Sequence, residues 1–255
     1  GVDRPLLAQL FGYFGQILHG DLGQSFVLRV DVRELIFARL PQTLFLVGYA
    51  GALAILLSIP LALIAAFRQG RLSDQLIRGS LVVALGIPSF WLGILLVTFL
   101  ALRTGWFPSG GFGDGFLEHL WHLFLPSLTL AVSFLAVVVR SLRASLLEVL
   151  GSDYVALARL KGIRRGRLAT HHLLRNAVKP ALTIFGLNLS YLLGTSVIVE
   201  SIFAINGIGN TLIGAILSRD FLVVQGIALT FGILVIGINL MVDMARLALD
   251  PREVR

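Results

Sequence analysis

Five apolar runs, each close to twenty residues or longer, limit most strongly what this chain can fold into. A helix needs about 20 mostly apolar residues to cross a hydrocarbon core of about 30 Å. The runs lie at about residues 43–67, 79–102, 121–139, 180–199 and 223–242. Spanning β-strands do not explain them, because such strands are about ten residues long and alternate in polarity. The pattern predicts an all-α integral membrane protein with five transmembrane helices.

The composition agrees with this fold class. Of the 255 residues, 56% are apolar and only 14% are Asp, Glu, Lys or Arg. A soluble domain would need more charge to cover its surface, and a disordered chain would be far less hydrophobic. Cysteine is absent, which excludes disulfides, thiolate metal sites and a cysteine nucleophile. Pro60 and Pro88 lie inside the first and second runs, and we expect kinks there.

The basic residues predict which loops face the cytoplasm. Three segments on one side of the predicted helices hold 15 Lys and Arg residues, and the three on the other side hold 6. The basic segments are 68–78, 140–179 and 243–255, and the others are 1–40, 103–120 and 203–222. Because cytoplasmic loops are enriched in Lys and Arg, the first set is expected inside. The chain then divides into an outward-facing (periplasmic) segment, 1–40, and a transmembrane domain, 41–255.

The outward position of residues 1–40 needs an explanation. No signal peptide or span precedes this amphipathic segment, and Gly1 is not a start methionine. We therefore expect an earlier transmembrane helix upstream, which would make six spans and place the true N-terminus in the cytoplasm.

The longest cytoplasmic loop, at about residues 143–179, carries most of the charge. Segment 140–179 has a net charge of +7, equal to that of the whole chain. Gly151 and Ser152 form a break, and Asp153 suits the positive start of a short helix. Such a helix is too short to be stable alone in water, so we expect neighbouring helices or a partner protein to hold it. A basic loop lying on anionic lipid is the alternative.

Other polar residues give weaker signals. His119 and His122, near Asp114 and Glu118, could hold a metal, but an interfacial cluster at the outer membrane boundary explains them better. Glu200 lies at the outward end of the fourth run, where it could line the outer mouth of a pathway or form a structural salt bridge. No carboxylate or histidine lies in the middle of a run, which speaks against a proton-coupled pump.

Several motifs resemble one protein family. The loop contains Asp153-Tyr154-Val155-Ala156-Leu157-Ala158-Arg159-Leu160-Lys161-Gly162 and then His172-Leu173-Leu174-Arg175-Asn176-Ala177. Both strings resemble the cytoplasmic loop of ATP-binding-cassette importer permeases, most closely the dipeptide, oligopeptide and nickel class. Further resemblances, in the family's order, are His19–Ser25, Arg39–Leu44, Ile87–Gly93, Leu125–Leu130, Val199–Phe203 with Gly207–Gly209, and Leu249–Arg252. The chain departs from the family at Asn206-Gly207, where Pro-Gly is usual.

The resemblance implies a type I importer permease fold, in a bacterial or archaeal cytoplasmic (inner) membrane. In this family the loop holds a coupling helix, which docks into a groove on a separate ATPase and passes its movement to the membrane helices. By position, Tyr154, Ala158 and Gly162 would lie at that contact. Asp153, Arg159 and Lys161 would supply cap, rim and charge contacts. A short amphipathic helix with apolar anchors is a common ligand for a protein groove.

The resemblance also implies the partners. They are a second homologous permease subunit in a heterodimer, two cytoplasmic ATPase subunits, a periplasmic or lipid-anchored substrate-binding protein and the lipid bilayer, with no nucleic acid. The chain would bind no cofactor, and ATP and Mg²⁺ would bind to the ATPase. In agreement, the sequence has no Gly-x4-Gly-Lys-Ser/Thr phosphate loop, and its only lysines are Lys161 and Lys179.

The sequence therefore predicts a permease subunit, not an enzyme, that forms half of a pathway for peptides or a related small solute such as a nickel complex. An autonomous secondary transporter or channel is the alternative, and it should show a mid-membrane ion site, which is absent from the pattern. An intramembrane hydrolase has the least support, because no nucleophile signature is present.

The docking assignment predicts the effect of two substitutions. Tyr154→Ala removes an aromatic anchor, and Gly162→Asp places a bulky charge in the contact. Each should uncouple ATP hydrolysis from uptake while the protein still inserts in the membrane. Uptake assays at matched expression test this, and unchanged uptake in both variants would remove the assignment.

Overall fold

The computed structural model describes residues 19–153 and 175–249, together with residues 5, 7, 11, 12, 15–17 and 155. The described chain is helical, apart from an isolated β-bridge between Gln24 and Asp31. Its elements are α2 (Val32–Phe67), α3 (Leu72–Gly86), α4 (Ser89–Leu96), the π-helix η1 (Val97–Arg103), α5 (Phe116–His122), α6 (Phe124–Leu150), α9 (Arg175–Ile202), α10 (Ile208–Leu217) and α11 (Phe221–Leu249).

Three of these helices, α2, α6 and α11, are long and apolar enough to cross a membrane. A fourth span exists if α3 and the α4–η1 arm are counted as one bent segment. These elements overlap the first, second, third and fifth predicted runs. The fourth run, 180–199, falls inside the 28-residue helix α9, which does not meet the criteria for a span within the described residues. The chain is thus an all-helical membrane protein with three or four candidate spans, and the number five stays a prediction.

The second run is not one continuous helix. The axes of α3 and the α4–η1 arm differ by 100°. Ile87 and Pro88 between them are extended, with ψ angles of 118° and 136°. Proline has no N–H to donate and disfavours helical geometry in the residue before it. The kink expected at Pro88 is therefore a full break, whereas α2 continues through Pro41 and Pro60.

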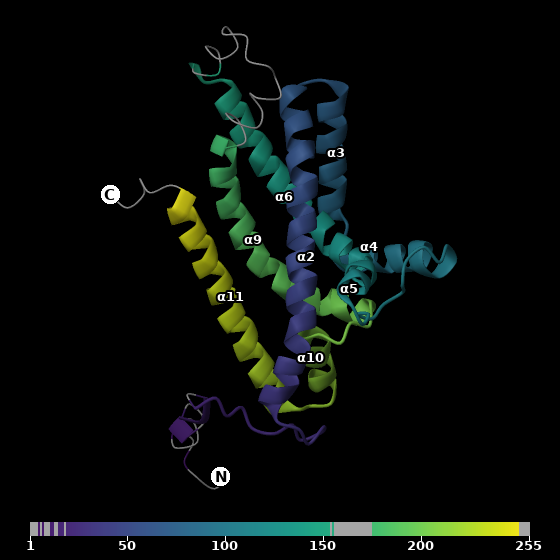
Figure 1. The fold of residues 1–255 in the computed structure, drawn as a ribbon, viewed down its shortest axis with the longest axis vertical. Coiled ribbons are helices and arrows are strands. Elements are labelled where there is room, and N and C mark those ends of the chain that lie inside the picture. The colour runs from purple at the N-terminus through teal and green to yellow at the C-terminus, as the bar shows by residue number, and fades with distance from the viewer. Residues whose placement is uncertain are drawn as a thin grey trace.

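The core lies between α2, α6 and α9, and α11 packs along one side of this group (Figure 1). Leu46, Leu130, Phe134, Leu192 and Phe203 belong to the largest cluster of buried apolar side chains. The outward faces of α3 and α11 leave large apolar side chains exposed, which suits contact with lipid. They include Val82, Val83, Ile236 and Leu240.

The two ends of the molecule differ in charge and in the segments they bring together. The turn from α2 to α3 and the end of α6 lie at one end, and the start of α2 lies near α10 at the other (Figure 1). The first end belongs to the basic segments and the second to the less basic ones. Asp31 caps α2 by accepting hydrogen bonds from the backbone amides of Arg33 and Glu34. Because the helix begins at Val32, the expected boundary between 1–40 and 41–255 falls inside α2.

A hairpin before α2 is attached to the start of α11. The Ser25 hydroxyl and the Val27 backbone amide both donate to Asp220 Oδ2, the amide over 3.3 Å. Burial of Asp220 favours the neutral acid, but these hydrogen bonds outweigh burial and lower the pKa of the carboxyl below its ordinary value. The attachment is therefore formed above the ordinary pKa of aspartate and weakens as the pH falls through the lowered pKa.

The contact between α9 and α11 predicts a difference between two glycines of the same helix. A Cβ atom at Gly186 would overlap Val242, whose Cβ would lie only 2.8 Å away, while Gly194 has nothing within 4 Å. Gly186→Ala should destabilise the protein by about 1–3 kcal/mol, because a short branched side chain cannot move aside. Gly194→Ala, the control, should be neutral or slightly stabilising. Thermal unfolding in detergent checks this, and equal melting temperatures would contradict the packing.

Candidate functional site

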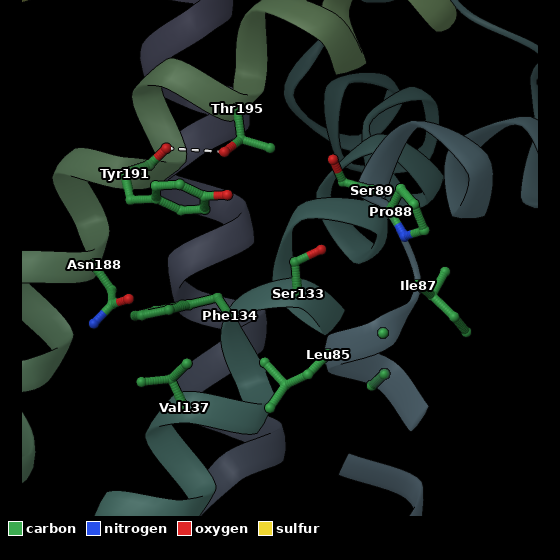
Figure 2. Close-up of a pocket in the computed structure, with 12 residues that line it drawn as sticks. Leu85, Ile87, Pro88, Ser89, Ser133, Phe134, Val137, Asn188, Tyr191 and Thr195 are labelled. Carbon is green, nitrogen blue, oxygen red and sulfur yellow. Dashed lines mark hydrogen bonds between the residues drawn. The ribbon is translucent and has the colours of Figure 1, made fainter. Parts of the chain in front are cut away.

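A cavity of about 420 Å³ lies where the break between α3 and α4 faces α6 and α9 (Figure 2). Its lining residues are Ala84, Leu85, Gly86, Ile87, Pro88, Ser89, Ser133, Phe134, Val137, Asn188, Tyr191 and Thr195. Ser133 and Val137 lie four residues apart on α6, as Tyr191 and Thr195 do on α9, so each pair shares a helix face. The broken backbone supplies the third wall, because α3 ends at Gly86 and α4 begins at Ser89.

The lining combines apolar side chains with polar groups and carries no charge. Ser89, Ser133, Asn188, Tyr191 and Thr195 contribute hydroxyl and amide groups, which both donate and accept hydrogen bonds. The Thr195 hydroxyl donates to the Tyr191 carbonyl of its own helix over 3.0 Å, which leaves its lone pairs able to accept (Figure 2). Such a surface can bind neutral polar groups such as peptide amides. It offers a charged group no counter-ion and a metal ion no carboxylate, imidazole or thiolate ligand.

Glu200 lies in a buried knot of hydrogen bonds at the C-terminal end of α9. Glu200 and Thr43 are both 0% exposed. The Thr43 hydroxyl donates to Glu200 Oε1 over 2.7 Å and accepts from the Ile208 backbone amide over 3.0 Å. The Asn210 backbone amide donates to Glu200 Oε2 over 2.9 Å. The knot therefore holds together α2, α9 and the start of α10.

Two glycines allow the backbone to approach this knot. A Cβ atom at Gly207 would lie 2.5 Å from Thr43 Oγ1, and one at Gly209 would lie 2.7 Å from Val197 Cα. Any side chain at these positions would push α10 away from Glu200. The chain has Asn206 where the resembling family usually has proline, but the glycine that follows is the residue the packing requires.

Neither sequence interpretation of Glu200 describes its observed contacts. Within the described part of the chain, its carboxylate has no basic partner, and its hydrogen bonds come from a hydroxyl and a backbone amide. Because the side chain is fully buried, the described geometry is that of a structural tie. A role at an outer mouth stays a prediction.

Residues 58–255 match the family described as binding-protein-dependent transport system inner membrane component. The chain belongs to this family. It is 36% identical to the oligopeptide transport system permease protein AppB of Bacillus subtilis, with 99% of this chain and 82% of that protein covered. It is also 36% identical to the glutathione transport system permease protein GsiC of Escherichia coli O6:H1, with 98% and 80% covered.

Solved structures agree on the fold. A chain of the methionine transporter MetNI in an inward-facing conformation superposes with a TM-score of 0.69 at 18% identity, over 85% of this chain and 96% of that one. A chain of an amino acid ABC transporter with histidines gives a TM-score of 0.62 at 18% identity, over 84% and 93%. The expected fold of a type I importer permease is confirmed at this level. The protein is therefore a permease subunit of the inner membrane and not itself the ATPase.

The docking residues are described only in part. Asp153 is exposed and directly follows the break at Gly151 and Ser152, where α6 has ended. The other docking residues, Tyr154, Ala158, Arg159, Lys161 and Gly162, lie outside the described residues. Their contact with an ATPase stays a prediction.

His119 and His122, at the predicted outer boundary, each contact a backbone carbonyl of the preceding loop. His119 Nδ1 lies 2.8 Å from the Phe112 carbonyl oxygen, and His122 Nδ1 lies 2.8 Å from that of Gly110. Glu118 accepts from the Asp114 backbone amide over 2.8 Å. Among the described residues, no three His, Cys, Asp or Glu side chains come close enough to hold a metal. These contacts agree with the interfacial-cluster interpretation.

The cavity residues were not singled out from the sequence. A usable signal was present, because Ser133, Asn188, Tyr191 and Thr195 are polar residues inside otherwise apolar runs, and three of them share a face of α9. Their partner wall could not be inferred, since nothing in the sequence gives the 100° angle at Pro88.

The knot at Glu200 predicts the effect of removing one hydroxyl. Thr43→Val keeps the side-chain shape but leaves Glu200 Oε1 and the Ile208 amide without their partner. It should destabilise the protein by about 1–3 kcal/mol, the cost of leaving buried polar groups unsatisfied. Thr230→Val is the matched control, because that hydroxyl donates only to the Gly226 carbonyl of its own helix. Melting temperatures in detergent compare the two variants. An equal loss of stability would show that the Thr43 hydroxyl contributes no more than a hydroxyl that bonds within its own helix.

Proposed function

We propose that this permease subunit imports peptides and that the cavity between α3, α4, α6 and α9 lines its half of the pathway. The observation that carries the proposal is the match over 98–99% of the chain to permeases named for oligopeptides and glutathione. Both cargoes present amide groups. The cavity lining matches that chemistry, because its hydroxyl and amide side chains can bind a peptide backbone whatever its sequence.

The same lining favours peptides over the nickel alternative. None of the twelve lining residues is His, Cys, Asp or Glu, the residues that bind nickel and related metals. A pathway without fixed charge also suits cargo whose net charge varies with its sequence. Selection among peptides would then fall mainly to the substrate-binding protein.

The energy for import comes from outside this subunit in the proposed scheme. We assign the chain one half of a heterodimer with a homologous permease, two cytoplasmic ATPase subunits and a periplasmic or lipid-anchored binding protein. The chain has five membrane-spanning helices in this scheme, with one more expected upstream. Its coupling helix, at about residues 153–162, docks on the ATPase. A proton-coupled transporter would need a residue that can carry a proton in the pathway, and the cavity lining contains no Asp, Glu, His, Lys or Arg.

Import by the complete transporter tests the proposal. The permease pair, the ATPases and the cognate binding protein are reconstituted in liposomes, and uptake of labelled tri-alanine and labelled glutathione is measured with and without ATP. ATP-dependent uptake of either probe is expected. Equal uptake without the ATPase would support a secondary transporter, and no uptake of either peptide would remove the peptide assignment.

The cavity itself is tested by narrowing it. Ser133→Leu fills part of the space. Accommodating the larger leucine side chain beside the cargo costs about 1–3 kcal/mol. Import should therefore fall roughly tenfold or more. Ser80→Leu is the matched control, because Ser80 is exposed on α3 and is not part of the lining. Rates are normalised to the assembled complex, and equal rates in both variants would place the pathway elsewhere.

A further inference from the structure

A two-point ion pair joins α3 to α6. Arg143 Nε donates to Asp74 Oδ1, and Arg143 Nη2 donates to Asp74 Oδ2, both over 2.9 Å. The Asp74 side chain is 1% exposed and that of Arg143 is 18% exposed. The Gly70 amide, in the turn between α2 and α3, also donates to Asp74 Oδ2 over 3.0 Å. Asp74 therefore ties the α2–α3 turn and α3 to α6.

Besides this pair, α3 is held by Leu81 and Ile77, which pack in an apolar cluster with residues of α2 and α6. The structure describes all of its 15 residues, and only Asp74 and Leu81 are buried. Leu72, Leu76, Val82 and Val83 are exposed on its outer face. A paired, hydrogen-bonded arginine in a fixed two-point geometry resists sliding and rotation, which a few apolar contacts do not. The position of α3 relative to α6 therefore depends on this pair as well as on those apolar contacts.

The pair lies between the predicted coupling helix, at about residues 153–162, and the cavity. Arg143 is eight residues before Gly151, about 12 Å along the helix, and Gly151 is the C-cap of α6, just before the predicted coupling helix. Asp74 is about 16 Å along α3 from Leu85, which lines the cavity. Ser133 and Phe134 of α6 line the same cavity from the other side. A movement at the end of α6 thus reaches two cavity walls if α3 and α6 move together.

We propose that the Asp74–Arg143 pair joins α3 and α6 into one rigid unit. This unit carries the movement of the coupling helix, at about residues 153–162, to the cavity and opens the cavity against α9. This inference rests on the proposed function. Asp74 and Arg143 are positioning residues, because neither lines the cavity. A pair that only stabilises the fold would change the amount of transporter but not the work obtained from each ATP.

The ratio of ATP hydrolysed to molecules imported separates these two roles. The complete transporter is reconstituted with tri-alanine as the cargo, and both rates are measured on the same vesicles. Arg143→Gln should raise the ratio roughly two- to thirtyfold, the range expected for loss of a coupling contact. Arg143→Lys, which keeps the charge and one hydrogen bond, should give a smaller rise.

Arg78 provides the matched control. Its Nε lies 3.6 Å from Asp74 Oδ1, but its side chain is 54% exposed and it belongs to α3 itself. Arg78→Gln removes a cation next to Asp74 without separating the helices, so the ratio should stay at the wild-type value. A wild-type ratio in Arg143→Gln, even with less transporter present, overturns the inference. If the wild-type transporter imports no cargo with ATP, the proposed function fails instead.

Cross-linking gives a second test that does not depend on the charge. Residues 1–255 contain no cysteine, so Asp74→Cys/Arg143→Cys introduces the only thiols in these 255 residues. Without a linker this variant should be uncoupled, and bridging the thiols with a flexible bis-maleimide should restore import. The same reagent across the cavity, in Ser133→Cys/Tyr191→Cys, should stop import. Loss of import on linking positions 74 and 143 would show that α3 and α6 must separate, which contradicts the inference.

Discussion

The structure depends on one constraint, which is that polar groups within a bilayer must find partners inside the protein. Helices pair the N–H and C=O groups of the backbone with one another. The broken segment at Ile87 and Pro88 faces a cavity instead of lipid. Side chains follow the same rule. Glu200 is fully buried, yet both carboxylate oxygens accept hydrogen bonds from Thr43 and from the Asn210 amide. Asp74 is satisfied by Arg143 and by the Gly70 amide.

The features predicted correctly from the sequence are those that a bilayer imposes on composition and order. Long apolar runs gave the helical class and overlap α2, α6 and α11. The order of short motifs gave the family, because several independent strings must match in sequence. The proline rule marked two positions, of which Pro88 lies at a break, whereas α2 continues through Pro60. Each of these properties is local, so each can be read without knowing which helices are neighbours.

The remaining features depend on contacts between residues far apart in the chain. Proline shows where a helix stops, but the 100° angle between α3 and α4 is set by what those helices pack against. For Glu200 the sequence leaves two roles open, a place at an outer mouth or a salt bridge, and its observed partner is a threonine 157 positions away. Asp74 and Arg143 both lie in loops or helix ends by sequence, where solvated charges are the usual explanation. Only the packing of α3 on α6 shows that they meet.

The distribution of charge along the molecule bears on how such a subunit can work. Ionisable groups are tied at the two ends of the bundle, by Asp74 and Arg143 at one end and by Glu200 at the other. The cavity between them combines apolar and polar groups and carries no charge. A carrier that binds a coupling ion needs an ionisable or ion-coordinating group where cargo and ion meet. The lining residues include no Asp, Glu or His to carry a proton, which agrees with the proposal that the energy for uphill transport comes from the ATPase. The Asp74–Arg143 pair between α3 and α6, close to the expected contact with the ATPase, is where that force would enter the membrane domain.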